Sequence, residues 1–370
     1  MNKDIYSYSI DELQSLFGEL GLPRFRAQQL FEWLHTHNAI SYDQMTNLPK
    51  ALRQQLSIAF PLSRTTLKEK QTSSDGTRKY LLELSDNELV ESVGIPSPPP
   101  ADKSVPNVSR ETFLDDFMPS TPSNDMQRLT VCFSTQVGCG MGCVFCATGQ
   151  EGLSRNLSAQ EIVDQVVTVQ QDFGQRVSNL VAMGQGEPFL NYENLMMALR
   201  RFNTDKGFQI GARHITVSTC GILQGIQQFT QEPEQFTLAV SLHSAVQVKR
   251  NYIMPALASQ PLDQLRSVIE EYISKTRRRI TFEYLLLQDI NDTEEDLLAL
   301  IEYCKGLLCH INLIPFNETG AALQGSSMDR IKVWLQRLNA NNISTTLRHS
   351  KGADIAGACG QLKNVSRETF

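Results

Sequence analysis

The 370-residue chain carries 34 Lys and Arg against 40 Asp and Glu, a formal net charge of −6 at pH 7. This balance argues against a protein coated in basic surface, so any nucleic-acid site must be a local patch. The chain is 41% hydrophobic, which can build a normal core, but it has no apolar run of membrane-spanning length and begins too polar for a signal peptide, so we expect a cytoplasmic protein without membrane contact.

Residues 1–75 are predicted to form a small helical domain. Ser9 and Glu12 have the spacing of a capping box that opens a helix. Pro23 stands at the start of a second helix, and a third is expected near Pro49. Because basic residues do not outnumber acidic ones here, charge does not decide between an RNA-contacting module and a packing domain.

Residues 76–95 are predicted to be a β-hairpin that leads into the main domain. Two strand-like runs lie between 78 and 95, with a turn at Ser85. Glu91 falls in the second run. A strand glutamate is usually solvated, and the spacing alone does not single it out.

Residues 96–128 are predicted to be a disordered, Pro-rich insertion. Seven of the 15 prolines fall between Pro96 and Pro122, among Ser, Asn and Asp, and this composition buries too little apolar surface to order itself. Within it, the sequence NVSRETF at 107–113 recurs at 364–370. A duplicated or inserted DNA element explains the repeat better than a working motif does.

From residue 129 onward, strand and helix patterns alternate, which predicts a core at 129–350 and a C-terminal segment at 351–370. The predicted strands are 129–135, 178–184, 213–219, 236–243, 279–287 and 309–316. The predicted helices are 158–173, 191–203, 222–230, 261–275, 293–306 and 327–339. Six βα units in series imply a parallel sheet with helices outside, and chemistry at the carboxyl ends of its strands.

Three cysteines lie within eight residues, in the pattern C-x3-C-x2-C, at Cys139, Cys143 and Cys146. Three thiolates are one fewer than a closed zinc or iron–sulfur site usually takes, so a [4Fe–4S] cluster held this way leaves one iron open. The alternative is a structural zinc site, which needs a fourth ligand close by, and no His falls between His37 and His214. Clustered cysteines indicate metal chemistry in a reducing cytosol rather than a disulfide framework.

Five blocks of this sequence resemble the RlmN/Cfr family of radical-SAM RNA methyltransferases (SAM, S-adenosylmethionine). They lie at 132–157, 181–188, 240–244, 312–317 and 352–362. The resemblance implies an α/β fold, a partial (β/α)6 radical-SAM barrel with a small N-terminal helical domain. It also implies a [4Fe–4S] cluster on the cysteine triplet. The family has only a few residues where this chain has its Pro-rich insertion.

Gly186 and Glu187 follow the second predicted strand of the core. Glycines let the backbone approach a ligand closely, and a carboxylate beside them can receive the ammonium group of SAM. The family usually has Met at the position of Gln185, which puts the fine shape of the pocket in question. The resemblance adds further SAM contacts at Ser218, Ser241, Leu242, His243 and Asn317. Each of these residues could instead have a structural role, as a strand-end hydroxyl or a hydrogen-bonded histidine does.

The resemblance also assigns covalent chemistry to two further cysteines. Cys359 takes a methyl group from one SAM, and a radical generated from a second SAM activates it for addition to adenine. Glu91 then acts as the proton acceptor, and Cys132 attacks the sulfur of Cys359 and releases the product as a transient disulfide. An electron donor such as flavodoxin or ferredoxin must reduce the cluster. Cys220, Cys304 and Cys309 are interpreted as buried apolar residues.

These features favour methylation of an adenosine of 23S rRNA, and of tRNA, at carbon 2. A carbon-8 methyltransferase of the same mechanism, or a paralogue with another RNA target, shares the same motifs. A radical-SAM activase would not need Cys132 and Cys359, and a zinc-binding RNA adaptor would not need Gly186 and Glu187. The basic run from Lys275 to Arg279 could contact phosphate, although such a run is usually only solvated.

Overall fold

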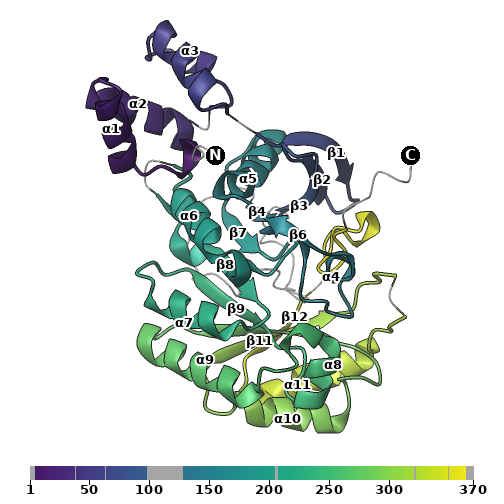
Figure 1. The fold of residues 1–370 in the computed structure, drawn as a ribbon. Coiled ribbons are helices and arrows are strands. Elements are labelled where there is room, and N and C mark those ends of the chain that lie inside the picture. Colours follow the sequence, from purple (N-terminus) through teal and green to yellow (C-terminus); the bar gives the residue numbers. More distant parts are fainter. Residues whose placement is uncertain are drawn as a thin grey trace, which may run out of the picture.

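The protein is described by a computed structural model that covers residues 5–37, 39–62, 64–97, 128–204, 207–320, 322–348 and 350–363. Three helices open the chain, as predicted: α1 (Ile10–Glu19), α2 (Arg24–His35) and α3 (Lys50–Ala59). The predicted capping box at Ser9 and Glu12 is confirmed, because each side chain binds the backbone N–H of the other. These helices have an apolar core of their own and lie at one end of the molecule (Figure 1).

The main sheet contains ten strands, whose order is β1-β2-β3-β4-β7-β8-β9-β10-β11-β12. Its first four strands pair in antiparallel fashion: β1 (Thr66–Thr72), β2 (Arg78–Glu83), β3 (Leu89–Pro96) and β4 (Leu129–Cys132). The hairpin predicted between 78 and 95 is therefore confirmed. Strand β1 lies inside the region predicted to be helical. It is a mostly exposed edge strand whose charged sequence gives no apolar alternation.

The remaining strands pair in parallel with their neighbours, beginning from β4. They are β7 (Asn179–Ala182), β8 (Ile215–Thr219), β9 (Thr237–Ser241), β10 (Ile280–Leu286), β11 (Cys309–Pro315) and β12 (Thr345–Leu347). The helices that connect and cover them are α5 (Ala159–Phe173), α6 (Tyr192–Asn203), α7 (Leu223–Gln231), α9 (Leu262–Thr276), α10 (Glu294–Cys304) and α11 (Met328–Ala340). All six predicted βα units are confirmed. The short strand β12 was not predicted.

Four further short elements were also not predicted. Strands β5 (Gln136–Cys139) and β6 (Gly152–Asn156) form a separate two-stranded sheet, with α4 (Ala147–Glu151) between them, and α8 (Gln247–Ile253) follows β9. The strand predicted at 129–135 ends at Cys132, and the chain turns away into β5. The three clustered cysteines consequently lie in a segment outside the main sheet.

Nearly all of the predicted insertion at 96–128 and both copies of NVSRETF lie outside the described residues. At the boundary of the insertion, the N–H of Ser97 donates to the carbonyl of Arg128 at 2.8 Å, which continues the pairing of β3 with β4. Within the described part of the chain, no helix has the length and apolar character needed to cross a membrane.

Candidate active site

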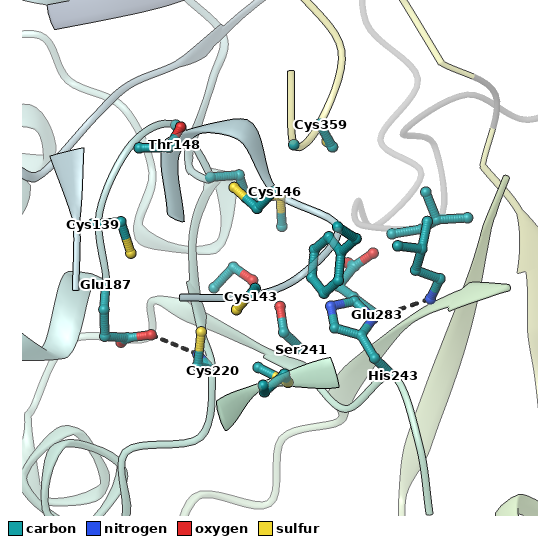
Figure 2. A pocket seen from close by; sticks show the side chains of 18 of the residues that line it. Cys139, Cys143, Cys146, Thr148, Glu187, Cys220, Ser241, His243, Glu283 and Cys359 are labelled. Carbon is teal, nitrogen blue, oxygen red and sulfur yellow. Dashed lines mark hydrogen bonds between the residues drawn. The ribbon is translucent and has the colours of Figure 1, made fainter. Parts of the chain in front are cut away.

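A single cavity opens at the carboxyl ends of the parallel strands. It contains most of the residues that the sequence singled out: Cys139, Cys143, Cys146, Gly186, Glu187, Ser218, Ser241, His243, Asn317 and Cys359. Figure 2 labels seven of them, and their side chains gather around one space: Cys139, Cys143, Cys146, Glu187, Ser241, His243 and Cys359. Three predicted residues do not line it: Leu242, Cys132 and Glu91.

The cysteine triplet is a compact loop with an apolar surround. Cys139 ends β5, Cys146 is the N-cap residue of α4, and Gly142 between them has a positive φ of 62°. Ile253 and Met254 of the α8 region pack against the loop. Burial raises the pKa of Cys139 to about 12 and raises that of Cys146, so a thiolate at either position requires a strong electrophile such as iron.

The triplet fits an iron–sulfur cluster better than a single zinc ion. Within the described residues, no three Cys, His, Asp or Glu side chains converge as a mononuclear metal site requires. Thiolates that bind different irons of one cluster need not meet at one point. The cavity beside the three sulfurs, and its apolar surround, provide space and exclusion of water for such a group.

The glycines of the loop 184–187 are needed for packing against the chain that leaves β4. A Cβ at Gly184 would lie 2.6 Å from Ser134 Oγ, and one at Gly186, where φ is +99°, would lie 2.6 Å from Gln136 Cβ. The sequence interpretation attributed these glycines to ligand approach. The structure shows that close contact between two protein segments also requires them.

Glu187 is buried, with three protein donors on its carboxylate. Its Oε1 accepts from Phe189 N at 3.0 Å and Thr219 Oγ1 at 2.7 Å, and its Oε2 accepts from Cys220 N at 2.6 Å. Burial raises its pKa. The thiol of Cys220 also contacts this carboxylate. The negative charge of the carboxylate would pair with a ligand ammonium group. Thr219 lines the cavity and was missed by sequence reasoning because it belongs to no motif. Cys220 was interpreted as a buried apolar residue, but it is only partly buried and also lines the cavity.

His243 is held in a conformation that few non-glycine residues adopt, with φ of 54°. Its Nδ1 accepts from Leu285 N at 3.0 Å, which leaves the N–H on Nε2. Burial, assisted by the positive charge of Arg250, lowers its pKa to about 3, so the ring is neutral. The ring can therefore donate one hydrogen bond to a ligand.

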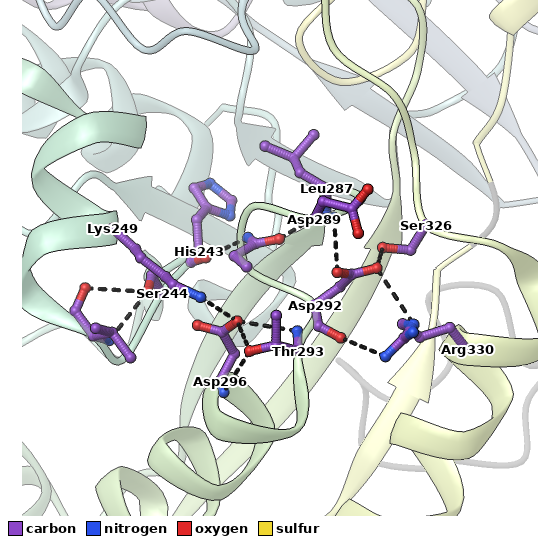
Figure 3. Close-up of polar contacts among 12 residues, drawn as sticks. His243, Ser244, Lys249, Leu287, Asp289, Asp292, Thr293, Asp296, Ser326 and Arg330 are labelled. Atoms are coloured by element: carbon purple, nitrogen blue, oxygen red, sulfur yellow. Dashed lines mark hydrogen bonds and ion pairs between the residues drawn. The ribbon is translucent and has the colours of Figure 1, made fainter.

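A buried amide fixes this strained backbone. The Nδ2 of Asn291 donates to the carbonyls of His243 at 2.6 Å and Leu285 at 2.7 Å, while its Oδ1 accepts from Leu287 N at 2.7 Å. Figure 3 shows the polar network that continues from here toward Asp292 and Asp296. Asn291 was also missed, because its role depends on contacts distant in sequence.

Leu242 differs from its neighbours in the same motif. Its side chain is fully buried in the main core, its N–H donates to the carbonyl of Glu283 at 3.0 Å, and its carbonyl accepts from Arg250. Its polar backbone atoms are thus already engaged within the protein. Ser218 and Ser241, by contrast, lie at the strand ends with their side chains on the cavity wall.

The C-terminal segment carries Cys359 across the cysteine loop. Asn317 Nδ2 donates to the carbonyl of Cys359 at 3.2 Å, Ala147 N donates to that of Gly360 at 2.8 Å, and Thr148 Oγ1 donates to that of Leu362 at 2.5 Å. Cys359 thereby reaches the cavity beside Cys146. Asn317, predicted to contact SAM, lines the cavity and also fastens the cysteine segment.

Cys132 lies behind the cavity wall but close to the same segment. It packs in one apolar cluster with Leu362, and it interacts electrostatically with Cys359. Burial raises its pKa to about 12. The partly buried guanidinium of Arg348 is a neighbour of both cysteines, and Cys359 raises the pKa of this arginine the most. The two cysteines predicted to act together are therefore neighbours of one cation.

Glu91 is also buried, and it lies against the C-terminal segment. Its carboxylate forms an ion pair with Lys79 at 3.0 Å and accepts from the backbone N–H of Lys363 at 2.8 Å. Burial raises its pKa, and Lys79 opposes that shift. Gln185, the residue that departs from the family, accepts from the backbone N–H of Glu91 at 3.1 Å. Glu91 is thus linked both to the loop 184–187 and to the segment of Cys359.

The basic run at Lys275–Arg279 lies just before β10, at the amino-terminal end of that strand and away from the cavity. Lys275 donates to Gln231, and Arg278 donates to the carbonyl of Phe236. These contacts give the run a structural role at that edge.

Comparison with known families and structures gives one consistent result. The family described as "Ribosomal RNA large subunit methyltransferase N-terminal domain" matches residues 3–60, and the Radical SAM superfamily matches residues 133–301. A crystal structure of a radical SAM methyltransferase from Sphaerobacter thermophilus is similar, with a TM-score of 0.85 and 38% identity. The match covers 98% of this chain and 100% of that one.

Curated relatives match over nearly the whole chain. A protein of Nostoc punctiforme is 42% identical over 356 residues, which are 96% of this chain and 92% of its own length. A protein of Bacillus licheniformis is 41% identical over 368 residues, with 98% and 94% coverage. Both carry the name "Probable dual-specificity RNA methyltransferase RlmN".

Proposed function

Since the chain belongs to the RlmN family of radical SAM RNA methyltransferases, we propose that it methylates carbon 2 of an adenosine in 23S rRNA and in tRNA. The names of the relatives give the reaction class, a dual-specificity RNA methyltransferase. The choice of ring carbon and of the two RNAs is our proposal.

The observation that supports it most is the convergence of four separate sequence blocks on one cavity. The cysteine triplet, the Gly186–Glu187 loop, the strand-end residues and Cys359 all line it. Cys139, Cys143 and Cys146 would hold the cluster. Glu187, His243, Ser218, Ser241 and Asn317 would bind SAM. When bound, the cluster and SAM together would supply a carbon-centred radical, a chemistry that no side chain of this protein can supply alone.

In this proposal Cys359 accepts a methyl group from one SAM as a thiolate, which is the nucleophilic form of cysteine. A second SAM is consumed in activating that methyl group, so two are used per turnover. The activated carbon bonds to the adenine ring while still attached to Cys359. The protein and RNA are then joined through a thioether.

Glu91 would take the ring proton, and Cys132 would attack the sulfur of Cys359. The carbon–sulfur bond to the RNA would break, and a disulfide would form between the two cysteines. The released carbon would take up a proton to complete the methyl group, and the unpaired electron of the adduct would return to the bound cluster. Two electrons from outside must then reduce the disulfide. We propose a flavodoxin- or ferredoxin-type protein as the donor to the cluster.

Mass spectrometry of 23S rRNA and tRNA from cells with and without the gene tests this proposal. We expect a 2-methyladenosine signal in both RNAs that disappears on deletion and returns with the wild-type gene. Loss of an 8-methyladenosine signal instead would replace the carbon-2 assignment with carbon 8. No change in either RNA would contradict the proposed substrates.

A further inference from the structure

Arg250 is a buried cation with an unusual set of partners. It belongs to α8, and 1% of its surface is exposed. Its guanidinium donates to the carbonyls of Ser241 at 2.9 Å and Cys220 at 2.7 Å, to the carbonyl of Leu242, and to Met254 Sδ at 3.3 Å. None of these partners carries a charge.

The neighbouring lysine makes the contrast clear. Lys249, on the same helix, forms an ion pair with Asp296 at 2.6 Å (Figure 3). Burying a cation without a paired anion is unfavourable, even when hydrogen bonds satisfy its donors. Burial lowers the pKa of Arg250, and this lowering reflects the cost of burying the charge. A nearby source of negative charge would offset it.

The groups closest to this guanidinium belong to the cysteine site. Cys220, whose carbonyl accepts from Arg250, has its thiol in hydrogen-bonding contact with Cys143. Met254 packs against Cys139 and Cys143. Arg250 also interacts electrostatically with Cys143. Arg250 itself does not line the cavity, so it acts across these residues and does not touch a ligand.

We propose that Arg250 is the internal counter-charge of the iron–sulfur cluster and that it raises the reduction potential of that cluster. This proposal depends on the proposed function, because it takes the cysteine triplet as the cluster ligands. Reduction adds one electron to the cluster from an external donor and breaks no bond. A fixed positive charge in a poorly polarisable region stabilises the more negative, reduced state.

Two substitutions separate charge from hydrogen bonding. Arg250→Gln removes the charge but retains an amide that can donate to the carbonyls, whereas Arg250→Lys retains the charge and loses part of the donor fork. Arg201→Met is the matched control. Arg201 is also buried, but its partners Gln160 and Leu34 belong to α5 and α2, and neither lines the cavity.

The measurement is the midpoint potential of the cluster, from an anaerobic titration with a low-potential chemical reductant followed by electron paramagnetic resonance. For Arg250→Gln we expect the ratio of reduced to oxidised cluster at a fixed potential to fall at least tenfold, which is about 59 mV for one electron. Arg250→Lys and Arg201→Met should stay close to the wild type. Arg250→Met provides a second neutral variant if Arg250→Gln does not retain iron.

Other outcomes overturn the proposal. Neutral variants with intact clusters and wild-type potentials would show that Arg250 has only a structural role. An equal shift in Arg250→Lys and Arg250→Gln would assign the effect to lost hydrogen bonds. Absence of iron and sulfide from the wild-type protein would instead contradict the proposed function, and the counter-charge with it.

Discussion

Cys132 and Cys359 are close to each other, but their surroundings suit different steps. Cys359 lines the cavity, while Cys132 is buried behind the cavity wall and has a pKa raised to about 12. A thiol of that pKa is largely protonated at neutral pH, so its attack requires loss of the proton. Arg348 favours the thiolate, although burial outweighs its effect.

We predict that Cys132→Ala accumulates protein covalently bound to RNA, because methyl transfer to Cys359 and addition to adenine do not need Cys132. Cys359→Ala and the double variant should form no adduct, since neither can carry the methyl group. Denaturing gels of protein from RNA-replete cells, with and without nuclease, measure this. Normal turnover of Cys132→Ala without any adduct would eliminate the two-cysteine mechanism.

The second residue-scale prediction concerns Lys79. Burial raises the pKa of Glu91 and Lys79 lowers it, so removing the lysine raises that pKa further. A base works in its deprotonated form, so the acidic limb of the pH–rate profile of product release should move to higher pH in Lys79→Met, by roughly 1 pH unit or more.

The control for Lys79 is Lys363→Met. Lys363 contacts Glu91 through its backbone N–H, which the substitution retains. Its pH profile should match the wild type, and Glu91→Gln should be slow at every pH. An acidic limb that does not move in Lys79→Met would show that Glu91 is not the group that titrates.

Sequence reasoning at this scale succeeded where residues belong to local motifs. The triplet, Gly186, Glu187 and the strand-end residues were predicted to meet, and they line one cavity. It failed for Thr219, Asn291 and Arg250, which belong to no motif and whose link to the site is a bond to a residue at least 30 positions away. It also placed Leu242 with its neighbours, although the side chain of that residue points into the core. The sequence motif does not show whether a side chain points into the core or toward the cavity.

At the scale of elements, the packing of the loop 184–187 leads to a stability prediction. A Cβ on Gly184 would lie 2.8 Å from the backbone of Phe133, which cannot move without disturbing β4. Gly184→Ala should therefore lower the free energy of unfolding by roughly 1–3 kcal/mol. Urea unfolding of the iron-free protein measures it.

Gly18→Ala is the matched control. A Cβ on Gly18, in α1, would meet nothing within 4 Å. Alanine is the better helix former by roughly 0.5–1 kcal/mol, so this variant should be as stable as the wild type or more so. Equal destabilisation of both variants would contradict the packing argument.

The elements that could be predicted are long, have a regular apolar pattern and begin at a recognisable residue. The helix predicted at 158–173 is α5, which a capping box of Ser158 and Glu161 opens, and the apolar strands of the core follow the predicted spacing. The missed elements are short or polar. Strand β12 has three residues, α4 has five, and β1 is an exposed edge strand, so none has enough apolar periodicity to register.

At the scale of the whole molecule, the pairing of β3 with β4 predicts the effect of deleting the Pro-rich insertion. The two strands are antiparallel neighbours, and Ser97 bonds to Arg128 where they leave the sheet. Deleting Pro98 to Asn124 leaves three residues, 125–127, between Ser97 and Arg128, a common length for a hairpin loop. The free energy of unfolding should change by less than about 1 kcal/mol, because loop-closure entropy varies slowly with length.

RNA methylation by the deletion variant should also stay close to that of the wild type, because the composition of the segment does not support packing. Calorimetry and RNA mass spectrometry test the two parts separately. Normal unfolding and iron content with lost methylation would show that the segment contacts RNA.

The strand order of the main sheet has a consequence for how the protein is made. Each strand pairs with one that precedes it in the chain, and only β5 and β6 stand apart, paired with each other. During translation the sheet can therefore grow by adding each new strand to an edge already present. Arg348 and Cys359 emerge after the other cavity residues. We expect a nascent chain halted before residue 345 to expose its three cluster cysteines for iron loading while still lacking the methyl carrier.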